Sequence, residues 1–186
     1  MTFSEQQKSA WQAAGTSAIE TFPEFEALFQ ENWTRVCTLI FHLVGDWAEA
    51  EDLALDAFWK LYNQPPKSEH NLSGWLYRVA SNLGINALRA RKRRLRYETE
   101  AGMAALESDP SKDTSTLVER EQQRQRVRLV LASMKSRSAQ VLILRYSGLS
   151  YEEIADALQV SAGSIGTLLA RAEKEFEKRY RDADNR

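Results

Sequence analysis

The chain has 186 residues, and its 25 Lys and Arg against 26 Asp and Glu leave a net charge of −1, so charge alone favours no class of partner. The single cysteine, Cys37, excludes a disulfide framework, and with only His42 and His70 beside it no Cys/His metal cluster can form. The polar start lacks the apolar segment of a signal peptide and no run of about 18 apolar residues occurs, so we expect a cytoplasmic protein without membrane insertion.

The first half of the chain predicts three helices. Apolar residues recur at helical spacing from near Pro23, which suits a first helical turn, until Gly45-Asp46 interrupts the period. A second helix is predicted over 47–63, because Gln64-Pro65-Pro66 must end it. A longer third helix is predicted over 73–96.

The stretch 98–116 contains Gly102, Pro110 and scattered Ser, Thr and acids, which is typical of an interdomain linker. Helical periodicity then returns, and no alternating β-branched run occurs, so we predict an all-α protein of two small helical domains joined by a flexible linker. The later helices are predicted near 118–133, 137–146, 151–158 and 162–180. The predicted parts are a loose extension 1–21, an N-terminal helical bundle 22–97, the linker 98–116 and a C-terminal domain 117–181.

The predicted second helix has two different faces on a helical wheel. One is the core stripe, formed by Trp47, Ala50, Ala54, Ala57, Phe58 and Leu61. The other carries two carboxylates beside two apolar side chains: Asp52, Leu55, Asp56 and Trp59. This second face is either a solvated surface with two stray apolar residues or a binding surface for a partner, and the wheel alone leaves both open.

The predicted third helix also has two stripes. Its expected core stripe consists of Leu72, Leu76, Val79, Leu83, Ala87 and Ala90. A separate polar stripe begins with an aromatic, passes through amides and ends in arginines: Trp75, Arg78, Asn82, Asn86, Arg89, Arg93 and Arg96. The run from Arg89 to Arg96 holds six positive charges in eight residues of an otherwise neutral chain.

Each residue type in this stripe suits a contact with nucleic acid. Arginines neutralise phosphates, Asn side chains bond to base edges, and an aromatic ring stacks on an unpaired base. A basic helix end that opposes the helix dipole would explain the arginines alone. It would not explain Trp75 on the same face, so the pattern favours nucleic-acid binding.

The C-terminal domain has the pattern of a helix-turn-helix. Ser150 and Glu153 are spaced as a capping box at the start of one short helix. A short turn, Gln159-Val160-Ser161, leads into the next helix, with Ser161 as its expected cap. Plain structural hairpins share this pattern, so the helix-turn-helix alone does not establish DNA binding.

Three runs resemble the extracytoplasmic-function (ECF) group of the sigma-70 family of RNA polymerase sigma factors. They are GDWAEAEDL at 45–53, GWLYRVASN at 74–82 and LILRYSGLSYEEIA at 142–155, in the order of that family. The resemblance implies promoter recognition and DNA melting for an alternative, stress- or envelope-responsive regulon. It implies core RNA polymerase and promoter DNA as partners, allows an anti-sigma factor, and implies no cofactor, no small-molecule substrate and no catalytic residue.

The resemblance also assigns roles to surfaces. Core polymerase would bind Asp52, Leu55, Asp56 and Trp59. The −10 element would contact Trp75, Arg78, Asn82, Asn86, Arg89 and Arg93, with a flipped base held by the loop from Asn63 to Ser73. The −35 element would contact Ser161, Ser164, Thr167 and Arg171.

The chain departs from the family pattern at several positions. Gly166, Leu168 and Glu173 stand where the recognition helix usually carries basic residues, which predicts weak phosphate anchoring at the −35 element. Met134 replaces a usual proline, Leu55 a usual polar residue and Asn86 a common aspartate. The rival interpretations are a DNA-binding regulator that does not engage polymerase and a protein-interaction adaptor without DNA contact. An enzyme is disfavoured, because no nucleophile–base set or phosphate-binding loop is found.

Overall fold

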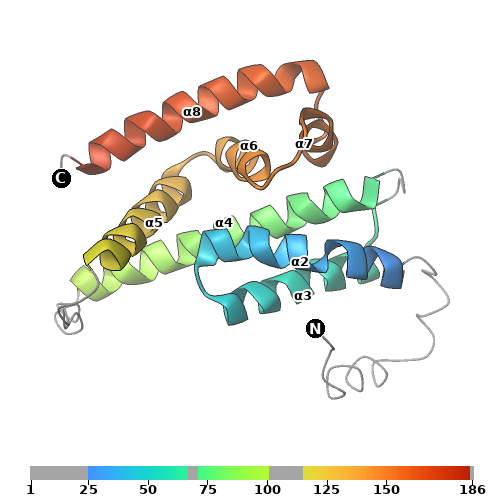
Figure 1. The fold of residues 1–186 in the computed structure, drawn as a ribbon, viewed down its shortest axis with the longest axis horizontal. Helices are drawn as coiled ribbons and strands as arrows, with labels where there is room; N and C mark the ends of the chain where they lie inside the picture. The colour runs from blue at the N-terminus through green and yellow to red at the C-terminus, as the bar shows by residue number, and fades with distance from the viewer. Residues whose placement is uncertain (1–24, 67–70, 101–114, 185–186) are drawn as a thin grey trace.

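The computed structural model describes residues 25–66, 71–100 and 115–184. Within these ranges the elements are all α-helices and include no strand. They are α2 (Phe25–Val44), α3 (Trp47–Asn63), α4 (Leu72–Glu100), α5 (Ser115–Ser133), α6 (Ser136–Tyr146), α7 (Tyr151–Leu158) and α8 (Ala162–Asp184). Figure 1 shows α4 running through the middle, with α2 and α3 on one side and α6, α7 and α8 on the other.

The predicted helices are present with small differences at their ends. Helix α4 continues to Glu100, and α5 begins at Ser115, so both ends of the expected linker 98–116 are helical. The rest of that linker, the expected extension 1–21 and Pro23 lie outside the described residues. The prediction that the linker is flexible therefore stays a prediction.

The turn between α2 and α3 depends on Gly45. Its φ of +80° lies in the left-handed region, which favours glycine, and its amide donates to the Phe41 carbonyl at 2.8 Å. Asp46 then caps α3, because its Oδ1 accepts from the Glu49 amide at 2.8 Å. The Arg128 guanidinium lies where a Cβ on Gly45 would stand. This turn therefore holds the α2–α3 hairpin and touches the C-terminal half.

The N-terminal bundle is built on an aromatic cluster. Phe25, Phe29 and Trp33 of α2 surround the fully buried Phe58 of α3, with ring centroids between 4.6 and 6.4 Å from it. Such contacts bury large apolar area and fix the two helices against each other. Trp47, expected in the core stripe, is instead 45% exposed, and its ring packs against the half-buried Phe41.

Helix α4 is buried over a wider arc than the wheel predicted. Tyr77, Ala80, Ile85 and Leu88 are buried, whereas the expected core residues Leu72, Val79, Leu83, Ala87 and Ala90 are half-buried. The reason is that α4 packs against α2 and α3 on one side and against α5, α6 and α7 on the other. A wheel that assumes one buried face cannot describe a helix packed on two.

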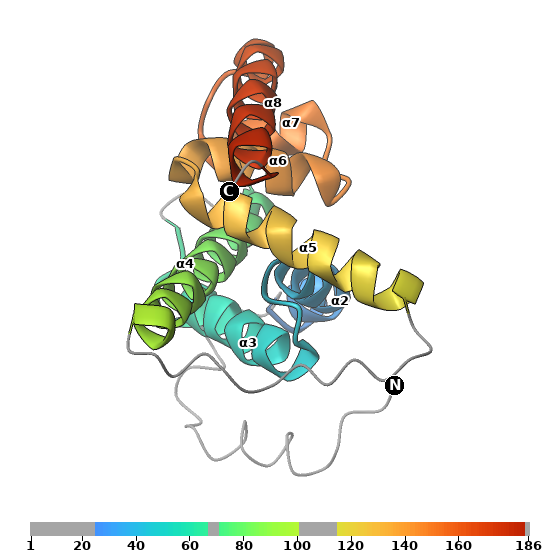
Figure 2. The ribbon, with the colours of Figure 1, turned by 90° about the vertical axis from the view of Figure 1, so that its left-hand side faces the viewer.

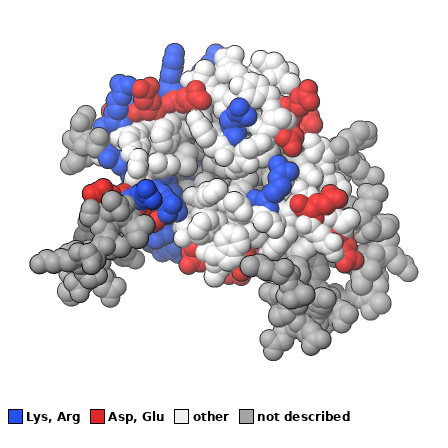
Figure 3. Space-filling model, viewed as in Figure 1, with Lys and Arg blue, Asp and Glu red and all other residues white. Residues whose placement is uncertain are grey.

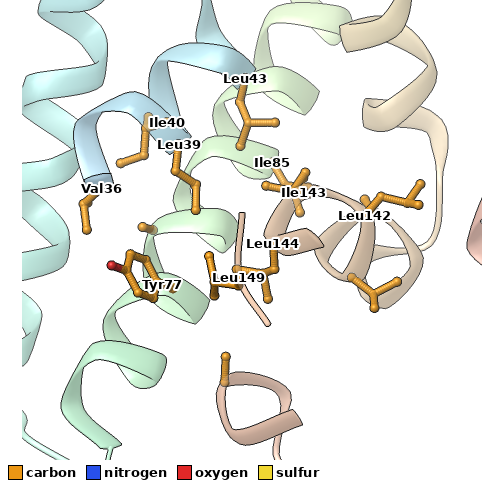
Figure 4. Close-up of a cluster of buried hydrophobic side chains, with 14 of the residues drawn as sticks. Val36, Leu39, Ile40, Leu43, Tyr77, Ile85, Leu142, Ile143, Leu144 and Leu149 are labelled. Atoms are coloured by element: carbon orange, nitrogen blue, oxygen red, sulfur yellow. The ribbon is translucent and has the colours of Figure 1, made fainter. Parts of the chain in front are cut away.

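The C-terminal helices share a core with the N-terminal bundle. One continuous cluster of buried side chains includes Leu43 of α2, Ile85 of α4 and residues 141–144 of α6, and Figure 4 shows the labelled members together. In Figure 2, α5 crosses in front of α2, and α6, α7 and α8 lie above it. The two predicted helical units are therefore present, and in this structure they pack against each other.

Candidate polymerase and nucleic-acid interfaces

The outer face of α3 is open in the structure. Asp52, Leu55, Asp56 and Trp59 are all exposed, with Trp59 52% exposed. Trp59 stacks on Tyr62 one turn along the same helix, with ring centroids 5.9 Å apart. The fold does not use Trp59 for its core, so this face presents an exposed aromatic ring together with two carboxylates.

The C-terminal half of the chain covers part of the polar stripe of α4 and leaves the rest exposed. Asn86 and Arg93 are exposed, whereas Trp75, Arg78 and Arg89 are half-buried. Asn82 is exposed but accepts a hydrogen bond from Gln140 of α6 at 2.8 Å. The predicted stripe therefore lies along α4, and the C-terminal helices cover part of it.

Arg89 is the member of the stripe whose hydrogen bonds to the C-terminal half stand out. Its guanidinium donates to the Ala132 carbonyl at 3.3 Å, the Met134 carbonyl at 2.9 Å and the Ser136 hydroxyl at 2.9 Å. The first two carbonyls lie at the end of α5, where the last backbone carbonyls of a helix lack intrahelical partners. Arg89 therefore caps α5 from another part of the chain.

The charged end of α4 remains accessible. Arg91, Lys92, Arg93, Arg94 and Arg96 are exposed, and Arg91 also donates to the Val44 carbonyl at 3.1 Å. On the face drawn in Figure 3, Lys and Arg are interspersed with Asp and Glu and form no single basic patch. The exposed Lys and Arg side chains near the end of α4 nevertheless concentrate positive charge along that helix.

The helix-turn-helix forms as predicted at its first helix. The Glu153 amide donates to the Ser150 hydroxyl, and the Ser150 amide donates to the Glu153 carboxylate at 2.7 Å, which completes the capping box. The hydrogen bond from the Ser150 amide, aided by the Ser150 side chain, holds the pKa of Glu153 below its usual range. The next turn uses the Ser161 carbonyl, which accepts from the Ser164 amide and hydroxyl.

The start of α8 offers one positive charge among the residues predicted to contact the −35 element. Ser161, Thr167 and Arg171 are exposed, whereas Ser164 is half-buried. Leu168 is half-buried and packs against the core, so its side chain is not free on the exposed side of α8. Gly166 and Glu173 are exposed and supply no positive charge.

A hollow of about 550 Å³ separates the two predicted DNA surfaces. Trp75 and Arg78 line it from α4, and Asp156 and Ser161 line it from the helix-turn-helix. Asn71 spans its edge, donating to the Asp156 carboxylate at 2.9 Å. Predicted −10 and −35 residues therefore face each other in this structure.

Two buried groups serve the fold rather than chemistry. Burial, with the charge of Glu51, raises the pKa of Cys37 to about 12, so the thiol stays protonated and unreactive. Tyr77 is buried and donates to the Asn32 side chain at 3.0 Å, and burial raises its pKa. In the described ranges no cluster of His, Cys, Asp and Glu could hold a metal ion, and no helix there is long and apolar enough to cross a membrane.

Sequence reasoning missed the residues that cover the stripe. Gln140 is buried in the apolar run of α6, and Ser136 begins that helix. A glutamine at a core position was the one available signal, because a buried amide requires hydrogen-bond partners. The sequence could not say that Asn82 and Ser81 are those partners.

Comparison with known proteins identifies the two halves. Residues 28–94 match the family model of sigma-70 region 2, and residues 124–176 match that of sigma-70 region 4. The chain is 32% identical over 162 residues to the RNA polymerase sigma factor YlaC of Bacillus subtilis (strain 168), covering 82% of this chain and 90% of that protein.

This chain belongs to the ECF group of the sigma-70 family.

Two further relatives agree. This sigma factor is 30% identical over 165 residues to the RNA polymerase sigma-H factor of Pseudomonas aeruginosa, covering 83% of this chain and 84% of that protein. It is 26% identical over 175 residues to the ECF RNA polymerase sigma factor SigW of Bacillus subtilis, covering 88% of this chain and 90% of that protein. A solved sigma factor RpoE, in complex with the anti-sigma factor NepR from Bartonella quintana, aligns with a TM-score of 0.47 and 20% identity over 84% of this chain and 98% of that one.

Family membership confirms the function expected from the sequence. Region 2 covers most of α2, all of α3 and α4 as far as Arg94, and region 4 runs from Arg124 in α5 to Phe176 in α8. Sigma factors are transcription initiation factors that bind core RNA polymerase and promoter DNA, so both partners follow for this sigma factor. The interpretations as a regulator that does not engage polymerase and as an adaptor without DNA contact are set aside.

Proposed function

We propose that this ECF sigma factor divides promoter recognition among three surfaces. The outer face of α3 binds core polymerase, the polar stripe of α4 reads the −10 element, and the exposed face of α8 reads the −35 element. The units are region 2 over 22–97 and region 4 over 117–181, joined by 98–116. The protein acts in the cytoplasm on an alternative, stress- or envelope-responsive regulon.

The observation that carries this proposal is the exposed Trp59 on the same face of α3 as Asp52 and Asp56. A large ring that the fold leaves in solvent is a suitable interface anchor, because burying it against a partner gains apolar area without disturbing the core. The carboxylates beside it form the polar rim that interfaces commonly carry. Leu55 adds apolar area where family members usually have a polar residue.

The α4 stripe supports two kinds of DNA contact. Arg89 and Arg93 suit phosphates, whereas Asn82 and Asn86 lie mid-stripe, where their amides suit base edges. Trp75 and Arg78 lie nearest the loop from Asn63 to Ser73, of which residues 67–70 lie outside the described ranges. In this position Trp75 suits stacking on a base that has left the duplex.

The α8 face supports a sparse −35 contact. Ser161, Ser164 and Thr167 offer hydroxyl groups, and Arg171 offers one positive charge. Few phosphates can be neutralised by such a face, so region 4 would contribute a small share of the salt dependence of promoter binding.

The experiment is run-off transcription with purified core polymerase and a genomic promoter library. The wild-type chain should select promoters that share a −10 and a −35 sequence, and Asn86→Ala should change the selected −10 sequence at a cost of roughly 1–3 kcal/mol per lost base contact. Gln30→Ala, which removes an exposed amide from α2, is the matched control and should select the wild-type set. An unchanged −10 preference in Asn86→Ala would refute the base-reading role of the stripe.

A further inference from the structure

Helix α8 continues well beyond the predicted −35 residues, which end at Arg171. It runs to Asp184 along the outer edge of the molecule (Figure 1). Its second half is held in place, because Phe176 packs against the core and stacks on Tyr180 with ring centroids 5.7 Å apart. The Arg126 guanidinium of α5 lies over the same Tyr180 ring, 4.7 Å from its centroid. Side chains on the exposed side of this half therefore have a fixed position relative to the helix-turn-helix.

Three basic side chains lie in a row on an exposed side of α8. Arg171, Lys174 and Lys178 (the basic row) are all exposed. With 3.6 residues per turn they fall within an arc of roughly 60°, and Thr167 falls inside the same arc. Asp182 lies one turn beyond Lys178 and ends the row. The basic row therefore continues the predicted −35 face toward the end of the helix.

The charges of the basic row are not neutralised within the part of the chain that the structure describes. Farther along the same helix, Arg179 pairs with Glu175 at 3.1 Å and Arg181 pairs with Glu177. Across residues 25–66, 71–100 and 115–184, no carboxylate forms an ion pair with a member of the row. Glu173 projects roughly 130° away from the centre of the row. A solvated helix surface commonly alternates the two signs of charge, whereas this one keeps three cations together.

The distance along α8 decides which part of a duplex the two lysines can reach. At 1.5 Å per residue, Lys174 lies about 15 Å and Lys178 about 21 Å beyond Ser164. The major groove is about 12 Å wide, so a helix that reads base edges with Ser164 and Thr167 brings both lysines to the groove wall, which consists of phosphates. An ammonium group is a compact charge on a flexible stem, and it suits a phosphate at such a wall.

We propose that Lys174 and Lys178 bind backbone phosphates of the duplex beside the −35 element and so anchor region 4 on promoters. This inference rests on the proposed −35 role of α8. The predicted −35 residues supply one positive charge, that of Arg171, and the two lysines add phosphate contacts farther along the same helix. Such contacts fix the position of the helix on the duplex and carry no base preference.

The experiment measures binding of holoenzyme to a promoter duplex over a range of salt concentrations. Lys174→Gln and Lys178→Gln should each reduce the salt slope by about one, and the double variant by about two. The binding defect of each single variant should therefore shrink about threefold as salt rises from about 50 to about 200 mM. The loss should be similar on promoters that differ by single base pairs in the −35 element, because phosphates are common to all of them.

Two further variants separate a phosphate contact from an effect of net charge. Arg120→Gln removes an exposed charge from α5 and is the matched control, so it should keep the wild-type slope. Lys174→Arg keeps the charge of the basic row and should also keep the slope. Thermal unfolding of Lys174→Gln and Lys178→Gln should match wild type, because both side chains are exposed.

Three outcomes would overturn the assignment. An unchanged slope in both lysine variants would show that the basic row does not anchor DNA. An equal loss in Arg120→Gln would show that net charge explains the effect. A changed choice of −35 sequence in the lysine variants would place them on bases and not on phosphates.

Arg171→Gln separates failure of this inference from failure of the proposed function. If Arg171→Gln lowers the slope and the lysine variants do not, α8 contacts the promoter but its DNA surface ends at Arg171, and the inference alone is refuted. If none of the three variants has an effect and single base changes in the −35 element leave binding unchanged, the −35 role of α8 is refuted as well.

Discussion

The outer face of α3 and the polar stripe of α4 look alike on a helical wheel, yet the fold treats them differently. Each carries a tryptophan among polar side chains on the side away from the expected core. Trp59 is 52% exposed and contacts its own helix at Tyr62, whereas Trp75 is half-buried beside region 4. A surface identified from one helix is thus a candidate for binding, and whether it is free depends on what else packs against that helix.

The largest expected effect, on the free energy of unfolding, tests which face of α3 is buried and which is exposed. Phe58→Ala should lower the free energy of unfolding by about 3–5 kcal/mol, because it removes a fully buried ring from the aromatic cluster with Phe29 and Trp33. Urea denaturation measures this. The neighbouring Trp59→Ala should change the unfolding free energy by only about 0.5 kcal/mol, and a loss comparable to that of Phe58→Ala would place Trp59 in the core.

The next effect tests whether the α3 face binds polymerase. Trp59→Ala should weaken binding to core polymerase by about 2 kcal/mol, or roughly 30-fold, because it removes an interface anchor. Titration of labelled protein with core polymerase measures this affinity. Trp47→Ala removes a similarly exposed ring from the other side of α3, so it should bind normally. Equal losses in both variants would show that the two faces are not distinct.

Substitutions of two arginines test the difference between the covered and the exposed part of the α4 stripe. Both Arg89→Ala and Arg93→Ala should reduce the salt slope of promoter binding by holoenzyme by about one, since each removes one phosphate contact. Only Arg89→Ala should also lower the free energy of unfolding, by about 1 kcal/mol, because only Arg89 caps α5. Thermal unfolding followed by circular dichroism compares them, and equal stability of the two variants would contradict the capping role.

The smallest effect concerns region 4, where local structure was predicted most completely. Ser150→Ala should cost about 1 kcal/mol of stability at neutral pH, because the hydroxyl that accepts from the Glu153 amide is lost. The lowered pKa of Glu153 means that its carboxylate stabilises the fold above its unfolded pKa, and this contribution is lost as the pH falls through the folded pKa. Ser150→Ala keeps the amide that donates to the Glu153 carboxylate, so Glu153→Gln is the variant that tests the charge. The difference in stability between wild type and Glu153→Gln should shrink in acid, and a constant difference down to low pH would exclude a role for the Glu153 charge.

The sequence by itself determined the helices, the capping box at Ser150 and the family. Helical spacing, the break at Gly45-Asp46 and the capping box at Ser150 are local features, and their effects depend on neighbours within about one turn. The exposed position of Trp59 could also be predicted, because α3 is packed on one side only. The residues assigned to polymerase and DNA contacts came from the wheel together with the family resemblance.

Only the tertiary structure decided what lies between the two halves. The burial of Tyr77, Ile85 and Leu88, and the engagement of Arg89 and Asn82 by region 4, depend on α4 being packed on two sides. These contacts join residues more than 40 positions apart, across a linker whose composition gives no preferred orientation. Periodicity along one helix records which residues are apolar, but it carries no information about which distant helix covers them.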